Sequence, residues 1–159
     1  DNDLDLGLIE TQPLHTELEA EPFARDEMCA VLPPSSPLAA QRTVTLEELA
    51  QYPFLLREPG SSGRTILEAS FALRQLAVRP AWESASTQAI LRAAAEGLGV
   101  AVLPERMARR AAEDGDVCLR PLADPIERTL HIVWHKSKYR TQTMQSFQTL
   151  CHSAGTGKL

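Results

Sequence analysis

Two segments of this 159-residue chain share one arrangement: a short apolar strand, then a turn of small residues, then an amphipathic helix. The first runs from FLLRE through the glycine turn at 60–63 into a helix expected over 64–76. The second runs from PAWES through SAST into an alanine-rich helix that Gly97 closes. Strands that alternate with helices predict an α/β fold with mixed, largely parallel sheets flanked by helices. Ligands of such folds gather beyond the carboxyl ends of the strands, so we expect both turns at one mouth.

The rest of the pattern adds strands and helices on either side of these segments. A capping box, with Thr45 as N-cap and Glu48 three residues on, predicts a short helix from Leu46. The polar run RDE between LEAEPFA and EMCAVLP predicts a hairpin of two short strands. Further strands are expected at 4–10, 100–104, 117–122 and 128–134, and further helices at 105–113 and 140–151. Because the strand at 4–10 lies almost at the start of the sequence, we expect earlier elements of the fold to be missing.

Composition excludes several classes of function. Sixteen basic and twenty-one acidic side chains give a net charge of -5, which lacks the basic surface that binding to nucleic acid requires. The apolar runs are too short to span a bilayer, and we expect a soluble cytoplasmic protein. The four histidines never approach metal-ligand spacing with a cysteine or carboxylate, and the three cysteines are widely separated. We therefore expect no metal, no cofactor and no disulfide framework.

The two small-residue turns carry the chemistry that this sequence suggests. A helix begins with unpaired N–H groups and a partial positive charge, so hydroxyls and glycines at that point can bind a small anion or carboxylate. Serine and threonine are equally favoured there as N-caps, whether or not a ligand binds, and one hydroxyl can serve both purposes. An arginine in the turn can pair with a carboxylate or remain a solvated charge. The candidates are Ser61, Ser62, Gly63, Arg64, Ser86 and Thr87.

Four stretches, in the order DLDLGLI, DEMCAVLPPSSPLA, FLLREPGSSGR and STQAILRAAAEGLGVAVLP, resemble the effector-binding domain of LysR-type transcriptional regulators. The resemblance runs from Asp3 to about Leu150. It implies a two-lobed α/β fold similar to type 2 periplasmic binding proteins, with the effector held between lobes that two crossover strands join. On this basis residues 1–14 and 123–152 form an incomplete first lobe, residues 15–122 form the second lobe, and residues 153–159 are a tail.

The resemblance also implies partners and a site. The effector would be a small molecule, expected to be a carboxylate or inorganic anion, and operator DNA would be bound only through an absent N-terminal winged helix-turn-helix. An incomplete first lobe exposes sheet edges, which favours association into a dimer or tetramer. The residues that the resemblance places against the effector are Glu10 or Thr11 at the crossover, Ser61 and Ser62 in the glycine turn, and Ser86 and Thr87 at the later helix start.

Two other functions fit parts of the pattern. A solute-binding protein of a transport system shares the two-lobed architecture and the anion chemistry of helix starts. A hydrolase could use Ser61 or Ser62 as nucleophile, but GSSG is one residue shorter than the Gly-x-Ser-x-Gly elbow and would need a histidine and a carboxylate nearby. We therefore expect a ligand-sensing regulatory domain that makes and breaks no covalent bond.

Overall fold

The computed structural model describes residues 4–13 and 15–155, which divide into two compact units. Unit 1 holds the described residues up to Asp26 and those from Glu127 onward, and unit 2 is Glu27–Ile126. Residues 15–26, expected in the second lobe, belong to unit 1, and residues 123–126, expected in the first lobe, belong to unit 2. Leu14, at the expected boundary, and residues 156–159 of the expected tail lie outside the described residues.

The sheet of unit 2 is mixed. The second half of β2 (Leu18–Leu32) pairs antiparallel with β5 (Ala101–Pro104) and with β6 (Cys118–Pro121), so β5 and β6 run in the same direction. The strand β3 (Phe54–Arg57) pairs parallel with β4 (Pro80–Ser84) and forms a parallel bridge from Phe54 to Val100, just before β5. Four strands of unit 2 thus share one direction, and β2 runs against them. The α/β class with helix-flanked sheets is as predicted.

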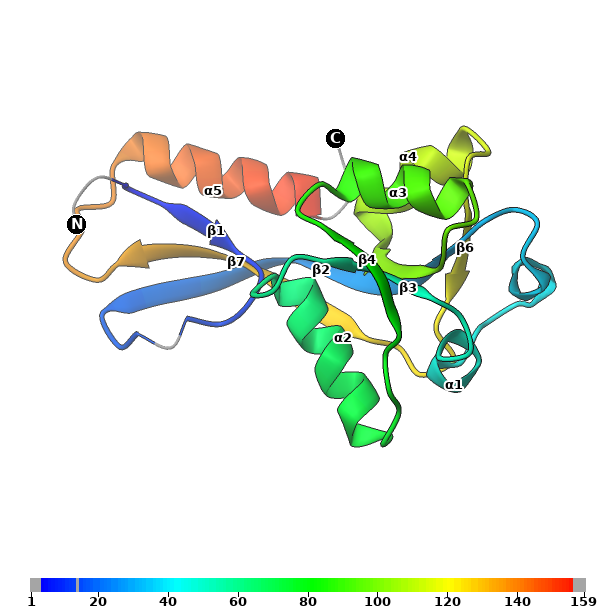
Figure 1. Cartoon of the computed structure of the whole chain (residues 1–159). Coiled ribbons are helices and arrows are strands. Elements are labelled where there is room, and N and C mark those ends of the chain that lie inside the picture. Colours follow the sequence, from blue (N-terminus) through cyan, green and yellow to red (C-terminus); the bar gives the residue numbers. More distant parts are fainter. Residues whose placement is uncertain (1–3, 14, 156–159) are drawn as a thin grey trace. The chain divides into compact units, whose positions relative to one another are not determined.

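Alternating side chains divide the core of unit 2 between the two faces of this sheet. Phe54 and Leu56 face one cluster, together with α1 (Leu46–Leu49) and α2 (Ser62–Leu73), whereas Leu55 faces the other, with α3 (Thr87–Ala95) and α4 (Glu105–Glu113). Figure 1 shows α2 on one side of β3 and α3 on the other. Phe54 and Phe71 meet edge to face, with ring centroids 5.3 Å apart, which adds roughly 1 kcal/mol to their burial. The period-2 pattern of the strands therefore places α2 and α3 on opposite faces.

Two further helical segments of unit 2 follow β2. A 3-10 helix, η1 (Pro37–Ala40), comes directly after the proline-serine turn, and Ser36 caps it. The capping box of α1 forms as predicted: Thr45 Oγ1 accepts from the Glu48 amide at 3.1 Å, and Glu48 accepts from the Thr45 amide at 2.8 Å. Both hydrogen bonds use donors that the helix would otherwise leave unpaired.

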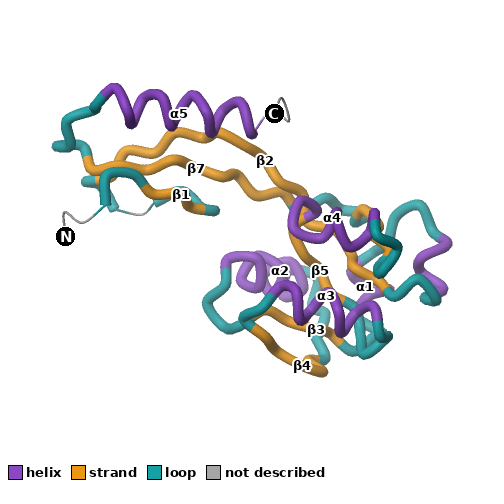
Figure 2. Tube along the Cα trace, turned by 90° about the horizontal axis from the view of Figure 1, so that it is seen from above, coloured by secondary structure: helices purple, strands orange, loops and turns teal. Residues whose placement is uncertain are grey.

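Unit 1 is a smaller sheet covered by one helix. The strand β1 (Gly7–Ile9) pairs antiparallel with β7 (Glu127–His135), which lies next to β2. The helix α5 (Gln142–Gly155) packs on these strands, as Figure 2 shows, and its Met144 and Cys151 contact Ile132 and Trp134 of β7. Burial raises the pKa of the Cys151 thiol, which keeps that sulfur protonated and unreactive at neutral pH.

One predicted element is wrong: no hairpin interrupts residues 18–32. β2 is a single strand of 15 residues that passes from unit 1 into unit 2 at Asp26. The run RDE resembled a turn because it is fully charged, yet Asp26 is buried and paired with Arg128, while Arg25 and Glu27 alternate outward as in any strand. A buried ion pair here takes the place of the turn that the polar residues suggested.

Candidate functional site

Both helix starts that the sequence singled out follow the carboxyl edge of the parallel β3–β4 pair. Residues 57–64 and 83–87 lie where these two strands end, and we call this set of residues the carboxyl edge. In the ladder Arg57 lies opposite Ser84, so the two strands end together. A four-residue connection leads from β3 to α2, and two residues lead from β4 to α3. Parallel pairing therefore brings together the starts of α2 and α3, which lie more than twenty residues apart in the sequence.

Local sequence explains how each helix begins at this edge. Gly60 has φ +89°, a left-handed conformation that suits glycine, and it turns the chain from β3 into α2. Ser61 is the N-cap of α2, and its Oγ accepts from the Arg64 amide at 3.3 Å. Ser86 is the N-cap of α3, and its Oγ accepts from the Ala89 amide at 3.3 Å. The capping role that the sequence left open is therefore occupied by both serines.

Arg57, which ends β3, links the two helix starts. Its Nη1 donates to Thr87 Oγ1 at 3.0 Å, which joins the end of β3 to the first residue of α3. Its Nε and Nη2 donate to the two carboxylate oxygens of Glu58 at 2.8 and 2.9 Å. These hydrogen bonds from Arg57 hold the pKa of Glu58 below its ordinary value of 4.5. The Arg57 side chain is 22% exposed, so solvent still reaches it.

Arg64 is held by protein groups on three sides. Its Nε contacts Glu68 of α2 at 2.7 Å, and its Nη1 contacts Glu83 of β4 at 3.0 Å. Nη1 also donates to the carbonyl oxygen of Arg57 at 2.9 Å. These carboxylates, Glu83 first, raise the pKa of Arg64 above its already high value. With its side chain only 14% exposed, Arg64 ties α2 to the ends of β3 and β4.

The other predicted residues of α2 lie where expected along the chain. Ser62 is the first residue of α2 and is partly buried. A Cβ at Gly63 would sit 3.5 Å from Met28 Cε, an ordinary contact, so this glycine faces β2 and the space there does not require it. The structure thus brings Ser61, Arg64 and Thr87 into one network through Arg57.

Glu10 and Thr11 belong to unit 1, where they follow β1. Glu10 pairs with Nη1 of Arg128 at 2.8 Å, and Thr11 is exposed. Nη2 of Arg128 also pairs with Asp26 at 3.0 Å, and both of these side chains are buried, at 6% and 3% exposure. The predicted crossover residue Glu10 is therefore one arm of a buried charge cluster that we call the Arg128 cluster, made of Glu10, Asp26 and Arg128.

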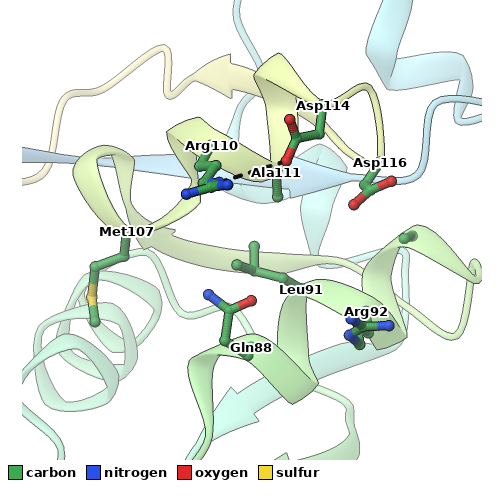
Figure 3. A pocket seen from close by; sticks show the side chains of 9 residues that line it. Gln88, Leu91, Arg92, Met107, Arg110, Ala111, Asp114 and Asp116 are labelled. Carbon is green, nitrogen blue, oxygen red and sulfur yellow. Dashed lines mark ion pairs between the residues drawn. The ribbon is translucent and has the colours of Figure 1, made fainter.

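A separate pocket of about 370 Å³ lies between α3 and α4 of unit 2 (Figure 3). Its floor is apolar, with Leu91 and Ala111, and its rim carries both signs of charge. In Figure 3 Arg110 and Asp114 form an ion pair on the rim, 3.8 Å apart, and the Arg110 side chain is 92% exposed. None of the sequence-predicted site residues lines this pocket, although Gln88 on its wall follows Thr87.

Sequence reasoning missed Arg57, Glu58 and Glu83. A signal for the first was present, because FLLRE places a charged residue at the end of a strand that is otherwise fully apolar. At the carboxyl end of a buried parallel strand, such a residue stands at the edge where ligands of α/β folds bind. Nothing in the sequence indicated Glu83, since its contact with Arg64 depends on the register between β3 and β4.

The described residues show neither a metal site nor a membrane-spanning helix. They contain no group of three or more histidine, cysteine or acidic side chains arranged to hold a metal ion. Among the helices of residues 4–13 and 15–155, none combines the length and apolar character needed to cross a membrane.

Comparison with known proteins gives one consistent family. The family model for the LysR substrate binding domain matches residues 1–156. The HTH-type transcriptional regulator YeiE of Escherichia coli (strain K12) is 32% identical over 154 residues, which are 95% of this chain and 52% of that protein. The chain thus spans about half the length of this relative.

Solved structures agree on the fold. The regulatory domain of CcmR from Synechocystis PCC6803, in complex with 2-PG, has a TM-score of 0.86 at 23% identity, covering 97% of this chain and 74% of that one. The effector-binding domain of QuiR, in complex with shikimate, has a TM-score of 0.79 at 17% identity, with 96% and 72% coverage. The chain therefore belongs to the LysR family of transcriptional regulators and is a ligand-sensing, substrate-binding domain of that family.

Proposed function

We propose that this domain senses a small anionic effector at the carboxyl edge of unit 2. The observation that carries the proposal is the network at this edge, in which two capped helices start together and Arg57 joins them through Thr87. Helix starts offer N–H donors and partial positive charge, and an arginine beside them adds a full charge. The proposed contacts are Ser61, Ser62, Gly63, Ser86 and Thr87, with Arg64 holding the edge in shape.

The direction of the hydrogen bonds supports an acceptor ligand. The hydroxyl oxygens of Ser61, Ser86 and Thr87 each accept a hydrogen bond from a protein N–H group. Each hydroxyl therefore has its own hydrogen left to donate, since a hydroxyl carries one donor and two lone pairs. A ligand rich in acceptor oxygens, such as a carboxylate, sulfate or phosphate, matches these three donors. The 2-PG and shikimate complexes of similar domains support a small-molecule ligand.

Glu10 and Thr11 of unit 1 stay predicted effector contacts, as the resemblance to the family implies. The Glu10 carboxylate would repel the anionic group of the effector. We therefore propose that Glu10 accepts a hydrogen bond from a hydroxyl or another donor of the effector. The effector would act by binding one arrangement of the two units more tightly than another, because only such a difference in affinity can shift the equilibrium. The proposed output is altered operator binding by an N-terminal winged helix-turn-helix in the same polypeptide.

The wider assignments are also proposals. We propose a cytoplasmic regulator that works as a dimer or tetramer and meets DNA only outside this domain, whose net charge of -5 disfavours contact with phosphates. Light scattering on the full-length regulator gives the oligomeric state. A gel-shift comparison of the full-length protein with the 159-residue chain tests where DNA binds, and operator binding by the isolated chain would contradict the proposal.

The two alternatives make different predictions. A transport protein would carry a secretion signal in its gene where a regulator carries a helix-turn-helix. A serine hydrolase would need a histidine and a carboxylate within hydrogen-bond reach of Ser61 or Ser62. Hydrolysis of an activated ester by the wild-type chain, lost in Ser61→Ala, would favour the hydrolase.

A thermal-shift screen tests the proposal. The chain is heated with sulfate, phosphate, 2-PG, shikimate and other small carboxylates, each against a chloride control of equal ionic strength. We expect at least one anion to raise the melting temperature, and Ser61→Ala and Thr87→Ala to lose most of that rise. An equal rise in both variants would place the site elsewhere.

A further inference from the structure

The two arginines of the carboxyl edge, Arg57 and Arg64, differ in how many N–H donors the described contacts occupy and in how exposed their guanidinium groups are. Arg64 donates to two carboxylates and to the Arg57 carbonyl, and its side chain is the more buried of the two. Arg57 uses Nε and one hydrogen of Nη2 for Glu58, and one hydrogen of Nη1 for Thr87. A guanidinium has five N–H donors, so within the described contacts one remains on each terminal nitrogen of Arg57.

Charge at this edge is not simply positive. Arg57 and Arg64 stand against the carboxylates of Glu58, Glu68 and Glu83, which leaves one carboxylate in excess. An anion that approached the edge would meet this excess unless one carboxylate gave up its arginine. Glu58 is the candidate, because its pair with Arg57 joins adjacent residues beside a glycine turn, and because Arg57 is the more exposed arginine, at 22% against 14% for Arg64. All three carboxylates reach solvent, at 39% to 49% exposure.

We propose that Arg57 is the specificity-determining cation of the effector site and that Glu58 competes with the effector for it. The inference rests on the anion-sensing function proposed above. An anionic oxygen of the effector would take the donors that Glu58 holds in the free domain, while Nη1 keeps Thr87 oriented. Arg57 would thus act in two ways: it supplies the charge, and its hydrogen bond turns the Thr87 hydroxyl hydrogen toward the ligand. A neutral ligand of the same size could not displace Glu58, so the exchange selects for anions.

Two substitutions, which we expect to change the affinity for the anion in opposite directions, test this exchange. Calorimetric titration of the chain with the anion that gives the largest thermal shift, in about 0.1 M chloride, measures the dissociation constant of each variant. Arg57→Gln should weaken binding by about tenfold or more, as expected for loss of charge-assisted hydrogen bonds. Glu58→Gln should tighten binding by roughly three- to tenfold, because the competitor loses its charge.

Glu68→Gln is the matched control. It removes the same charge from α2, next to the carboxyl edge, where Glu68 pairs with Arg64 and not with Arg57, so it reports the general electrostatic effect alone. We expect it to change the dissociation constant less than Glu58→Gln does. Equal tightening in Glu58→Gln and Glu68→Gln would overturn the competition, as would weaker binding in Glu58→Gln. Unchanged binding in Arg57→Gln would overturn the role of Arg57.

These failures differ from failure of the proposed function. If no anion stabilises or binds the wild-type chain, the anion-sensing proposal itself falls. If the wild type binds and only the Arg57 and Glu58 variants behave otherwise than expected, the sensing function stands and this inference falls. Should Arg57→Gln fail to fold, Arg57→Lys and the Glu58→Gln result still decide, because tighter binding in Glu58→Gln than in Glu68→Gln requires a competitor at the site.

Discussion

Arginine pairs with carboxylate in both units, but in very different surroundings. In unit 1 the Arg128 side chain is 6% exposed and its partner Asp26 is 3% exposed. In unit 2 Arg57 is 22% exposed and its partner Glu58 is 39% exposed. A buried pair resists separation because removal of one partner leaves a charge without compensation, whereas an accessible pair can exchange partners with solvent or a ligand. The same chemistry therefore fixes strands in one unit and leaves a donor available in the other.

The largest effect should come from Asp26→Ala. The substitution leaves Arg128 buried with Glu10 as its remaining carboxylate, and we expect it to lower the free energy of unfolding by about 3 to 5 kcal/mol. Chemical denaturation of the wild type and the variant measures this difference. Glu10→Gln changes the partly exposed carboxylate of the Arg128 cluster, and it should lower the free energy of unfolding clearly less than Asp26→Ala does. An equal loss of unfolding free energy in both variants would show that the greater burial of Asp26 does not make its pair with Arg128 more stabilising than that of Glu10.

Arg57→Gln should have a much smaller effect on stability. Its ion pair with Glu58 is partly solvated, so solvent and salt screen the attraction and the pair contributes little to stability. We therefore expect a denaturation midpoint close to that of the wild type, together with anion binding that is weaker by about tenfold or more. A loss as large as that of Asp26→Ala would mean that Arg57 is a structural hub like Arg128 and would remove the contrast between the units.

Acid titration of Glu58 sharpens the comparison further. Arg57 lowers the pKa of Glu58, so the stabilisation from this pair is present above pH 4.5 and is lost as the pH falls through the lowered pKa. In Arg57→Gln we expect the pKa of Glu58 to rise toward 4.5. Carbon NMR of the Glu58 carboxyl in the two proteins measures the change, and an identical pKa in both would show that Arg57 does not hold this carboxylate.

The smallest effect is expected at the pocket between α3 and α4. Arg110 is almost fully exposed and lies 3.8 Å from Asp114, so solvent screens the pair. Arg110→Ala should change the free energy of unfolding by no more than about 0.5 kcal/mol and should leave anion binding intact. Weaker anion binding in this variant would move the effector site from the carboxyl edge to this pocket.

Much of the fold could be predicted because its signals are local. The capping box at Thr45, the glycine turn after β3 and the hydroxyls before α3 each specify a boundary within a few residues. The two halves of β2 were predicted as strands, but their continuity could not be predicted, because the buried Asp26 between them pairs with Arg128, 102 residues further along the chain. Long-range pairing also hid Arg57, whose partner Thr87 comes within reach only through the parallel register of β3 and β4.

Nuclear magnetic resonance mapping of anion binding tests the central claim most directly. Amide spectra of the chain are recorded during titration with the most stabilising anion, against chloride at equal ionic strength. We predict that the largest chemical-shift changes fall on residues 57–64 and 84–89 and that they saturate as the anion concentration rises. In Arg57→Gln the same changes should saturate only at higher anion concentration, because the variant binds the anion more weakly. Shift changes centred on α4 and the rim at Arg92 and Arg110, with residues 57–64 unaffected, would contradict the account.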